Sequence, residues 1–410
     1  MFCCLPASFA LSGFGCLTAT SAQALPEYTV KVSAPNRSYR CVPVSVVLPA
    51  PKPGDAWGGA TVGDLQTKQP VACTPVALPE DRVEVTWLVQ DLAQGASRSY
   101  RLAFVKEAAV GGSSVALSEP AAGAVEIKVG DALFTRYCFE GAPKPYCYPI
   151  IGPTGVPVTR SYPMEQVASE DQDHPHQRSL WFTHGEVNGI DFWAEGPKTG
   201  REVHKGFQTL QSGTVCGVLR AQDDWLSAEG QKVCEDVREL RVYNLPEVRL
   251  FDFTVTVKAT DGPVEFGDTK EGTFGIRVAS VMDVTPAHPD AHITNSEGQR
   301  DADTWGKAAD WCDYSAPIDG KMVGISILDH PASFRHPTYW HVRTYGLFAA
   351  NPFGLRHFIN DQTGKGRYTL QPGGEVTFRY RVLIHPGNVE EAKVADWYAE
   401  YADPPTIKVQ

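Results

Sequence analysis

Short stretches in which apolar and polar residues alternate recur along almost the whole chain, and they restrict it to a β fold. The clearest are residues 28–33, 83–87, 248–257, 274–279 and 376–384. Turns rich in proline, glycine and aspartate separate them, and alternation of period two is the pattern of a half-buried strand. The best helix candidate is the stretch 388–401 near the end. We therefore predict an all-β protein.

The spacing of these strands predicts two β-sandwiches in series. Residues 25–115 hold short alternating strands and no histidine, so we expect a small Ig-like β-sandwich without a catalytic role. Residues 124–410 continue the strand pattern, which predicts a large antiparallel β-sandwich. A chain of this length is also too long for one ordinary core.

The first 24 residues predict a signal peptide. Residues 1–24 carry no charge, and Ala22-Gln23-Ala24 fits the small-x-small cleavage pattern. No later run approaches the roughly 20 apolar residues of a membrane span. We expect a secreted or periplasmic protein with no stable membrane insertion after removal of the signal. Cys16 leaves a lipoprotein anchor as the lesser alternative.

Cysteine usage and charge limit the partners further. Three of the ten cysteines lie in the leader. Spacing does not fix connectivity, but in an oxidising compartment proximity favours the disulfides Cys41–Cys73, Cys138–Cys147 and Cys216–Cys234, with Cys312 left over. The chain has 48 acidic against 37 basic residues, which argues against a nucleic-acid partner.

The densest group of chemically active residues is the stretch 171–193, with three histidines, four acids, one arginine and two tryptophans. Its Asn188-Gly189 pair suits a type I′ hairpin turn. Alternation about that turn would place one set of side chains on a single face: Phe182, His184, Glu186, Asp191 and Trp193. The opposite face would take Trp181, Thr183, Ile190 and Phe192. A merely solvated hairpin is the alternative for any one of these residues.

Two histidines precede that hairpin and flank Pro175. His174 and His176 would point the same way if the chain is extended there. The preceding Asp173 does not by itself make a dyad with His174, because neighbours on a strand face opposite ways.

The stretch 268–277 contains a candidate general base, Glu271, at the mouth of a predicted strand. Glu271 and Arg277 lie six residues apart, roughly 20 Å along a strand, so they are not a pair. The alternative is that Lys270 and Glu271 are ordinary turn charges.

The stretch 336–354 carries a polar and aromatic row. Alternation puts Tyr339, His341, Arg343 and Tyr345 on one face, where they could hydrogen-bond sugar hydroxyls and stack on a sugar ring. A structural cross-strand ladder is the alternative.

The spacing of the histidines in the sequence gives little support for a cofactor or metal site. His174 and His176 with His184 or His341 could hold a divalent metal, but no spacing of predictive force is present. We predict no cofactor and leave a divalent metal open. A serine hydrolase is disfavoured because no Gly-x-Ser-x-Gly elbow occurs.

Over roughly residues 125–400 the chain resembles a family of secreted bacterial proteins of unknown function, labelled PmoA-like or methane oxygenase. The resemblance rests on the stretches 173–178, 184–193, 268–277 and 340–354. The family usually reads His-Pro-His-His-Arg-Gly, whereas this chain has Gln177 and Ser179. The methane oxygenase label conflicts with the chain, because such a membrane subunit needs spanning helices.

The resemblance implies sugar catabolism and a sandwich similar to the mutarotase-like supersandwich, a superfamily that commonly uses a histidine and a carboxylate. We therefore predict a carbohydrate-active enzyme, a glycoside hydrolase, lyase or epimerase, that acts on a glycoside or a modified sugar. His174 or His176 would be the acid and Glu271 the base. The residues expected to bind substrate are Arg178, His184, Asp191, Trp193, Lys270, Arg277, His341, Arg343 and Tyr345. The alternative is a non-catalytic glycan-binding protein, which Gln177 favours.

Overall fold

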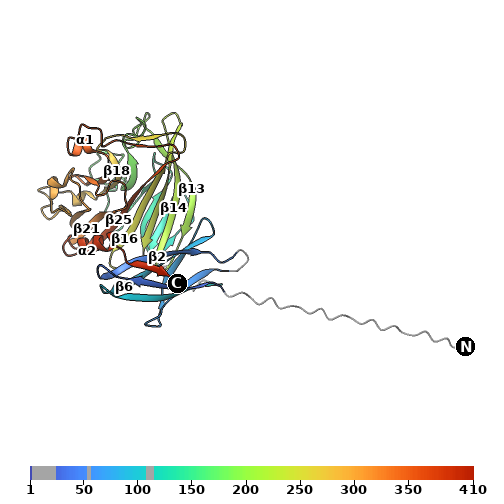
Figure 1. The fold of residues 1–410 in the computed structure, drawn as a ribbon. Coiled ribbons are helices and arrows are strands. Elements are labelled where there is room, and N and C mark those ends of the chain that lie inside the picture. Colours follow the sequence, from blue (N-terminus) through green and yellow to red (C-terminus); the bar gives the residue numbers. More distant parts are fainter. Residues whose placement is uncertain (2–24, 53–56, 108–114) are drawn as a thin grey trace.

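The computed structural model describes Met1 and residues 25–52, 57–107 and 115–410, and it confirms the all-β prediction. Figure 1 shows a small sandwich beside a larger one. Residues 2–24 of the expected signal peptide lie outside the described residues, and so does most of the glycine-rich stretch before residue 115.

The small sandwich consists of two antiparallel sheets. Their strand orders are β26-β1-β7-β3-β4 and β2-β6-β5. The strands are β1 (Glu27–Ser33), β2 (Tyr39–Pro49), β3 (Gly59–Asp64), β4 (Pro70–Val71), β5 (Cys73–Leu78), β6 (Arg82–Leu92), β7 (Ser97–Val105) and β26 (Thr406–Val409). Alternate residues such as Val30 and Val32 are buried, and Trp87 fills the centre of this core. The last strand, β26, pairs with β1, although it lies inside the predicted segment 124–410.

The large sandwich consists of two eight-stranded antiparallel sheets and a small two-stranded one. The sheet that we call the short sheet contains, in order, β22 (Tyr339–Val342), β23 (Leu347–Asn351), β18 (Gly272–Arg277), β12 (Leu180–His184), β11 (Tyr146–Cys147), β10 (Ala132–Cys138), β9 (Ala124–Val129) and β8 (Val115–Leu117). The long sheet contains, in order, β13 (Arg201–Gln211), β14 (Cys216–Leu226), β15 (Lys232–Tyr243), β16 (Arg249–Lys258), β25 (Glu375–Pro386), β21 (Lys321–Asp329), β20 (Trp311–Ile318) and β19 (His292–Asn295). The pair is β17 (Val264–Phe266) with β24 (Tyr368–Leu370).

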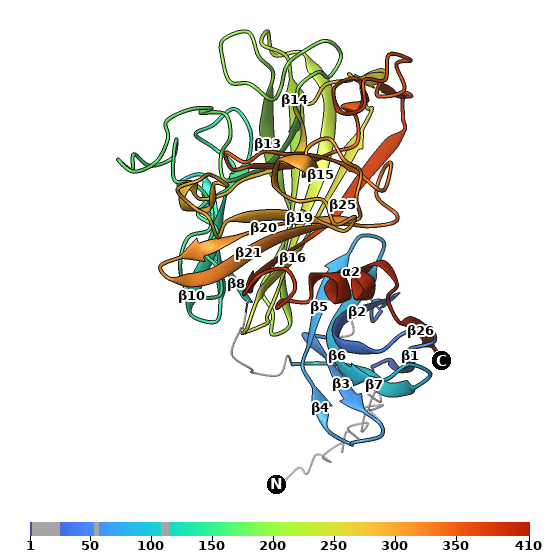
Figure 2. The ribbon, with the colours of Figure 1, turned by 90° about the vertical axis from the view of Figure 1, so that its left-hand side faces the viewer.

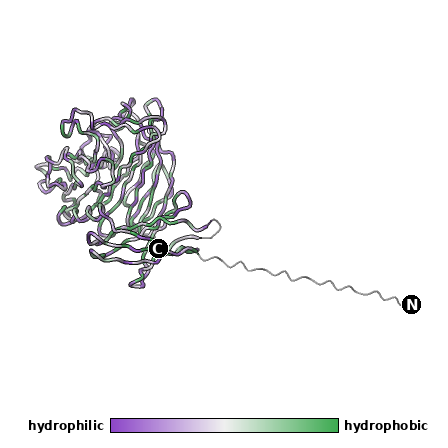
Figure 3. Tube along the Cα trace, viewed as in Figure 1, coloured by the Kyte–Doolittle hydropathy of each residue, from purple (hydrophilic) through white to green (hydrophobic). Residues whose placement is uncertain are grey.

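Aromatic side chains from facing strands form the core between the long and short sheets. The Phe182 ring lies 5.2 Å from that of Phe378, and Phe274 stacks on Tyr380 at 4.9 Å. All four rings are buried, and each contributes about 1.5–3 kcal/mol by leaving water. Because side chains alternate across a strand, the residues between these on the short sheet point away from the core. Figure 3 shows the same alternation of hydrophobic and hydrophilic residues along the strands.

Helices are few and short in the described part of the chain. Besides α1 (Leu355–Phe358) there are two 3₁₀ turns, Ser280–Met282 and Asp301–Thr304. The helix expected at 388–401 is present as α2 (Val394–Ala402). It lies between the small sandwich and the long sheet (Figure 2), with its Val394 and Trp397 in an apolar cluster shared with both. No helix in the described ranges has the length and apolarity that crossing a membrane requires.

The three expected disulfides are not formed, and each described cysteine is a free thiol. Cys41 and Cys73 lie on β2 and β5, which are separated by β6, and their partners on β6 are Gln90 and Trp87, so the two cysteines are about 14 Å apart. Cys147 lies opposite Tyr137, so its neighbour across the ladder is not Cys138, which points to the other face.

The third expected disulfide, Cys216–Cys234, is excluded by the strand register. Cys216 lies opposite Tyr243, whereas Cys234 lies opposite Trp225 at the far end of β14. That separation is about 30 Å along a strand, well beyond the reach of a disulfide. Sequence proximity was therefore a poor guide to spatial proximity in these long hairpins.

Candidate functional site

The outer face of the short sheet brings the three chemically rich stretches together. Trp181 on β12 lies opposite Gly275 on β18, Gly275 opposite Ala349 on β23, and Ala349 opposite His341 on β22. These residues form one row across four strands. The intervening residues, such as Phe182, face the core. Trp193, which follows β12, packs on Trp181 of this row, and Phe358 of α1 packs on His341.

Asp173 and His174 form a dyad, contrary to our expectation. His174 Nδ1 lies 2.7 Å from Asp173 Oδ2, and both side chains are about four-tenths exposed. The chain is not a strand here, because His174 has φ +44°, and this left-handed residue lets neighbouring side chains meet. A carboxylate only accepts hydrogen bonds, so Nδ1–H donates to Asp173 and Nε2 is left for another partner.

Two buried arginines hold Asp173 in place. Arg160 Nη1 donates to Asp173 Oδ1 at 2.5 Å, and Arg277 Nη2 donates to the same oxygen at 3.2 Å. Burial raises the pKa of Asp173, but the charge of Arg277 and the hydrogen bonds from Arg160 and His174 outweigh it and lower that pKa below its usual value. Asp173 is thus a fixed anion that orients His174.

Tyr345 is the centre of the exposed part of the site. Its ring stacks on the His174 imidazole with centroids 5.4 Å apart and planes 8° from parallel. The Arg277 guanidinium lies 4.9 Å from the ring centroid and that of Arg343 lies 5.7 Å away. Arg343 is exposed and also lies over the ring of Trp305, at 5.7 Å.

Lys270 and Glu271 border the same surface. Lys270 Nζ pairs with Glu271 Oε1, and both side chains are partly exposed at the start of β18. The charge of Glu271 acts to raise the pKa of Tyr345, although burial of Tyr345 is the larger cause of that rise. We call this group the Tyr345 surface: Asp173, His174, Lys270, Glu271, Trp305, Arg343 and Tyr345.

A second, more buried cluster adjoins it at His176. The His176 ring lies 5.7 Å from His174 and 6.3 Å from Trp193. Burial and then the charge of Lys144 lower the pKa of His176 to about 4, so this imidazole is neutral at neutral pH. At neutral pH, His176 is therefore not in the imidazolium form that a general acid requires.

Arg178 and Trp193 support the site rather than face a ligand. Arg178 donates two hydrogen bonds to Glu195, at 2.9 and 2.8 Å, and Lys144 Nζ lies 3.4 Å from the same carboxylate. Lys144 also donates to the Trp193 carbonyl at 2.8 Å. Trp193 is 2% exposed and packs on Trp181 at 5.2 Å. Trp193 therefore has no exposed ring face, contrary to the expectation that it binds substrate.

The expected faces of the hairpin are also wrong, although its turn is present. Asn188 and Gly189 have positive φ, and Val187 pairs with Ile190. However, β12 ends at His184, and the Asp191 carboxylate accepts hydrogen bonds from the amides of Trp193 and Ala194. This capped turn breaks the alternation. Asp191 therefore shapes a turn instead of binding substrate.

Two expected histidines lie in the protein interior. His184 is fully buried against Phe353, and its Nε2 lies 2.8 Å from the Gly267 carbonyl oxygen. Burial lowers its pKa to about 4. His341 is 2% exposed beneath Phe358, and burial followed by the charge of Lys270 lowers its pKa to about 3. Neither imidazole reaches the exposed surface, so the substrate-binding role expected of both is wrong.

Arg277 is likewise 1% exposed and acts through its neighbours. Its Nη1 donates to Gln177 Oε1 at 2.5 Å. Gln177, at the position where the resembling family has a histidine, is itself 1% exposed. The substitution therefore changes the support beneath the Tyr345 surface instead of removing an exposed imidazole.

Sequence reasoning missed Arg160, Lys144 and Glu195, which fix the site from below. No local pattern marks them, because each acts through a partner at least eleven residues away in the chain. As for metal ligands, no group of three or more His, Cys, Asp or Glu residues in the described ranges is arranged to hold an ion.

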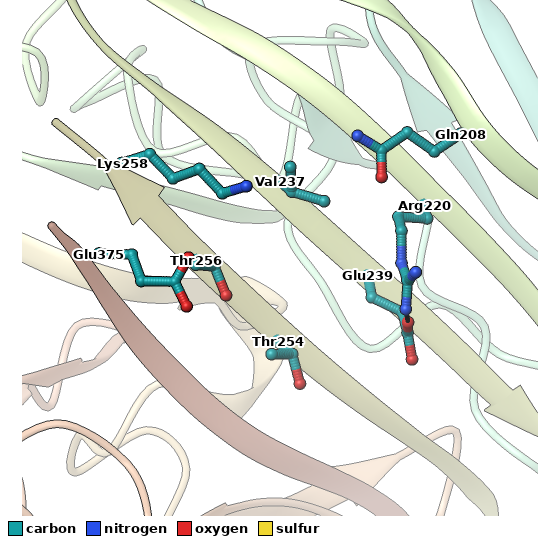
Figure 4. A pocket seen from close by; sticks show the side chains of 8 residues that line it. All are labelled: Gln208, Arg220, Val237, Glu239, Thr254, Thr256, Lys258 and Glu375. Carbon is teal, nitrogen blue, oxygen red and sulfur yellow. Dashed lines mark hydrogen bonds and ion pairs between the residues drawn. The ribbon is translucent and has the colours of Figure 1, made fainter. Parts of the chain in front are cut away.

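The polar groove of about 310 Å³ in Figure 4 lies elsewhere, on the outer face of the long sheet. Its charged side chains are largely matched. Arg220 pairs with Glu239, and Lys258 lies directly opposite Glu375 in the ladder. It contains no expected site residue and has the composition of a solvated sheet face.

These features define a two-sandwich, all-β protein with a histidine–carboxylate dyad and aromatic rings on one sheet face. The chain belongs to a family of unknown function, DUF6807, whose model matches residues 124–399. This agrees with the expected family of unknown function, and the PmoA-like label stays a prediction. No curated protein matches the chain.

Several solved structures are similar in backbone. A glycosyl hydrolase family 38 protein from Enterococcus faecalis is 14% identical with a TM-score of 0.44, covering 94% of this chain and 47% of its own. An alpha-mannosidase from Enterococcus faecalis V583 is 14% identical with a TM-score of 0.42, covering 95% and 47%. A galactose mutarotase related enzyme from Lactobacillus acidophilus is 12% identical with a TM-score of 0.26, covering 66% and 97%. The chain spans about half the length of the first two. Similarity this low carries no argument about function.

Proposed function

We propose that the protein is a carbohydrate-active enzyme that acts on a glycoside or a modified sugar by acid–base chemistry at the Tyr345 surface. The Asp173–His174 dyad is the observation that carries this proposal. Its carboxylate fixes the imidazole tautomer, and its Nε2 stays free to exchange a proton with substrate. Two buried arginines hold the Asp173 carboxylate in place. An incidental hydrogen bond at the surface would not need this support.

Glu271 is the second proton-transfer group in this proposal. It directly precedes β18, the strand whose Arg277 lies 4.9 Å from the centroid of the Tyr345 ring. In its imidazolium form, which the Asp173 carboxylate stabilises, His174 would donate its Nε2 proton to a leaving or ring oxygen, while the Glu271 carboxylate removes a proton from water, a hydroxyl or a carbon. The rings of Tyr345 and Trp305 are flanked by His174 and the arginines, and the ring surface that these neighbours leave exposed would contact the sugar.

We also propose that the protein acts outside the cytoplasm and belongs to the PmoA-like family. The predicted signal peptide supports the location, and the stretches 173–178, 184–193, 268–277 and 340–354 support the family label.

The test is turnover by purified wild type, His174→Gln and Glu271→Gln on a panel of glycosides, oligosaccharides and their oxidised derivatives, with metal analysis of each sample. Loss of a proton-transfer group predicts a rate reduction of about 10²–10⁴ with the fold intact by circular dichroism. His292→Gln, an exposed histidine on β19, is the matched control. Wild-type rates in both site variants would refute the assignment.

A non-catalytic glycan-binding protein is the second candidate, and two observations favour it. The Glu271 carboxylate is already paired with Lys270, and Gln177 replaces the histidine of the resembling family. This alternative predicts saturable binding without product. Tyr345→Ala would then reduce affinity more than Glu271→Gln does.

A further inference from the structure

Arg343 differs from the other cations of the site because its side chain has no hydrogen bond and no ion pair within the described part of the chain. It is exposed at the Tyr345 surface. An exposed arginine is ordinarily free to move, but this guanidinium lies over two rings, those of Trp305 and Tyr345, each at 5.7 Å. Such contacts hold the cation in place without using its N–H donors.

We propose that the ligand of the Tyr345 surface is an acidic sugar, one that carries a carboxylate or a sulfate ester, and that Arg343 binds this anion. The proposal rests on the proposed function, since it names the substrate class of the same site. A guanidinium presents its donors in a planar fork that matches two oxygens of an anion. The rings under Arg343 position that fork beside His174, which stacks on Tyr345.

The charge balance of the site supports an anionic ligand. Asp173 is held by Arg160 and Arg277, and Glu271 is paired with Lys270. In the adjoining cluster, Arg178 and Lys144 together hold Glu195. Every one of these carboxylates therefore has its own cation, and none is left to repel a bound anion.

Asp283 is a further acid, and it lies near Arg277. It is 8% exposed, and a side chain built at Gly346 would meet its Oδ1 on one side and Arg277 Nε on the other. Asp283 thus faces buried Arg277 beneath the surface. Among the cations named here, Arg343 alone has no carboxylate partner in the described part of the chain, although the whole chain has a net charge of −11. A cation without a partner at the site favours an anionic ligand.

The experiment measures binding of matched ligands to the full chain by titration calorimetry. The ligands are methyl glucoside, methyl glucuronide and methyl glucoside 6-sulfate, with the corresponding galactose series. They differ only at carbon 6. We expect wild type to bind one of the acidic ligands at least tenfold more tightly than its neutral counterpart. A preference for the glucuronide would identify a carboxylate as the anionic group of the ligand, and a preference for the 6-sulfate would identify a sulfate ester.

Arg343→Gln should remove that preference, so that the variant binds the acidic and the neutral ligand with affinities within about twofold of each other. Arg201→Gln, an exposed arginine on β13 in the long sheet, is the matched control and should keep it. Equal binding of neutral and acidic ligands by wild type would overturn the acidic class and leave the proposed function standing. A preference that survives Arg343→Gln would overturn the role of Arg343. Absence of binding by every ligand would overturn both proposals.

Discussion

Asp173 connects the interior of the large sandwich to its exposed surface. Its carboxylate touches His174 on one side and the buried arginines Arg160 and Arg277 on the other. Removing this charge takes from two buried cations the carboxylate to which they donate, which is costly because arginine cannot lose its proton. The carboxylate is also what selects the His174 tautomer, so stability and activity depend on one side chain.

Asp173→Asn should therefore reduce the free energy of unfolding by about 1–3 kcal/mol, less than for a fully buried pair because Asp173 is 42% exposed. Urea unfolding followed by tryptophan fluorescence measures it. Glu119→Gln removes a carboxylate from an exposed position and should change stability by less than about 0.5 kcal/mol. A loss for Asp173→Asn no larger than this control would contradict the role assigned to the arginines.

His341 makes a prediction about pH. Its pKa in the folded protein is about 3, against 6.5 for an unperturbed histidine, because burial disfavours the charged imidazole. The unfolded chain thus binds a proton between these values that the folded protein does not. The stability contributed by neutral His341 is present above about pH 6.5 and is lost as the pH falls toward 3.

Buried His184 acts in the same direction, whereas Glu202, with its pKa raised to about 7, acts in the opposite one, so single variants must be compared with wild type. His341→Gln should make the fall of unfolding free energy with decreasing pH less steep, by up to about 1.4 kcal/mol per pH unit. Urea unfolding at about pH 7, 6 and 5 tests this. His292→Gln removes an exposed imidazole and is the control. Parallel curves for wild type and His341→Gln would show that His341 takes up its proton when folded.

Strand alternation is what made the fold predictable from the sequence. The stretch 274–279 was expected as a strand and lies largely in β18 (Gly272–Arg277). Tyr339 and His341 share a face as expected, opposite Asn351 and Ala349 of β23. Each of these predictions needed only the local period of two, which the backbone imposes wherever a strand is formed.

The site was less predictable, because its key contacts arise where strands end. The left-handed backbone at His174 and the turn capped by Asp191 reverse the directions that alternation implies. Arg160 meets Asp173 only through the tertiary fold, so its neighbours in the sequence give no sign of its role. Burial was also invisible locally: His341 alternates correctly on β22 but is covered by Phe358 of α1.

The row on the outer face of the short sheet depends on Gly275 of β18. A methyl group built there would lie 2.7 Å from the Trp181 ring, so Gly275→Ala must displace that indole and, with it, Trp193. Overpacking of this kind costs about 1–3 kcal/mol. Urea unfolding measures the loss. Gly63→Ala on β3 is the matched control, because its nearest neighbour is 4.0 Å away. Equal stability of Gly275→Ala and Gly63→Ala would mean that Trp181 and Trp193 can move to accommodate the methyl group without loss of stability.

The two sandwiches are joined by more than their connecting chain. Strand β26 pairs with β1, and helix α2 packs between the sandwiches. Polar contacts cross the same interface. Arg241 of β15 in the long sheet donates to Glu84 Oε2 at 2.5 Å and to Thr86 Oγ1 at 3.1 Å, both on β6 of the small sandwich. The small sandwich is therefore expected to unfold together with the large one.

Arg241→Met tests that coupling. Arg241 is 7% exposed, and its loss leaves Glu84 without the cation that faces it across the interface. We expect a loss of about 1–3 kcal/mol and, because the lost contacts lie between the sandwiches, a separation of one calorimetric transition into two. Arg220→Met is the matched control: Arg220 also pairs with Glu239, but its contacts stay within the long sheet. It should leave a single transition. If both variants show two calorimetric transitions, or if neither does, the Arg241 contacts are not what couples the two sandwiches. The coupling would then depend on α2 and β26.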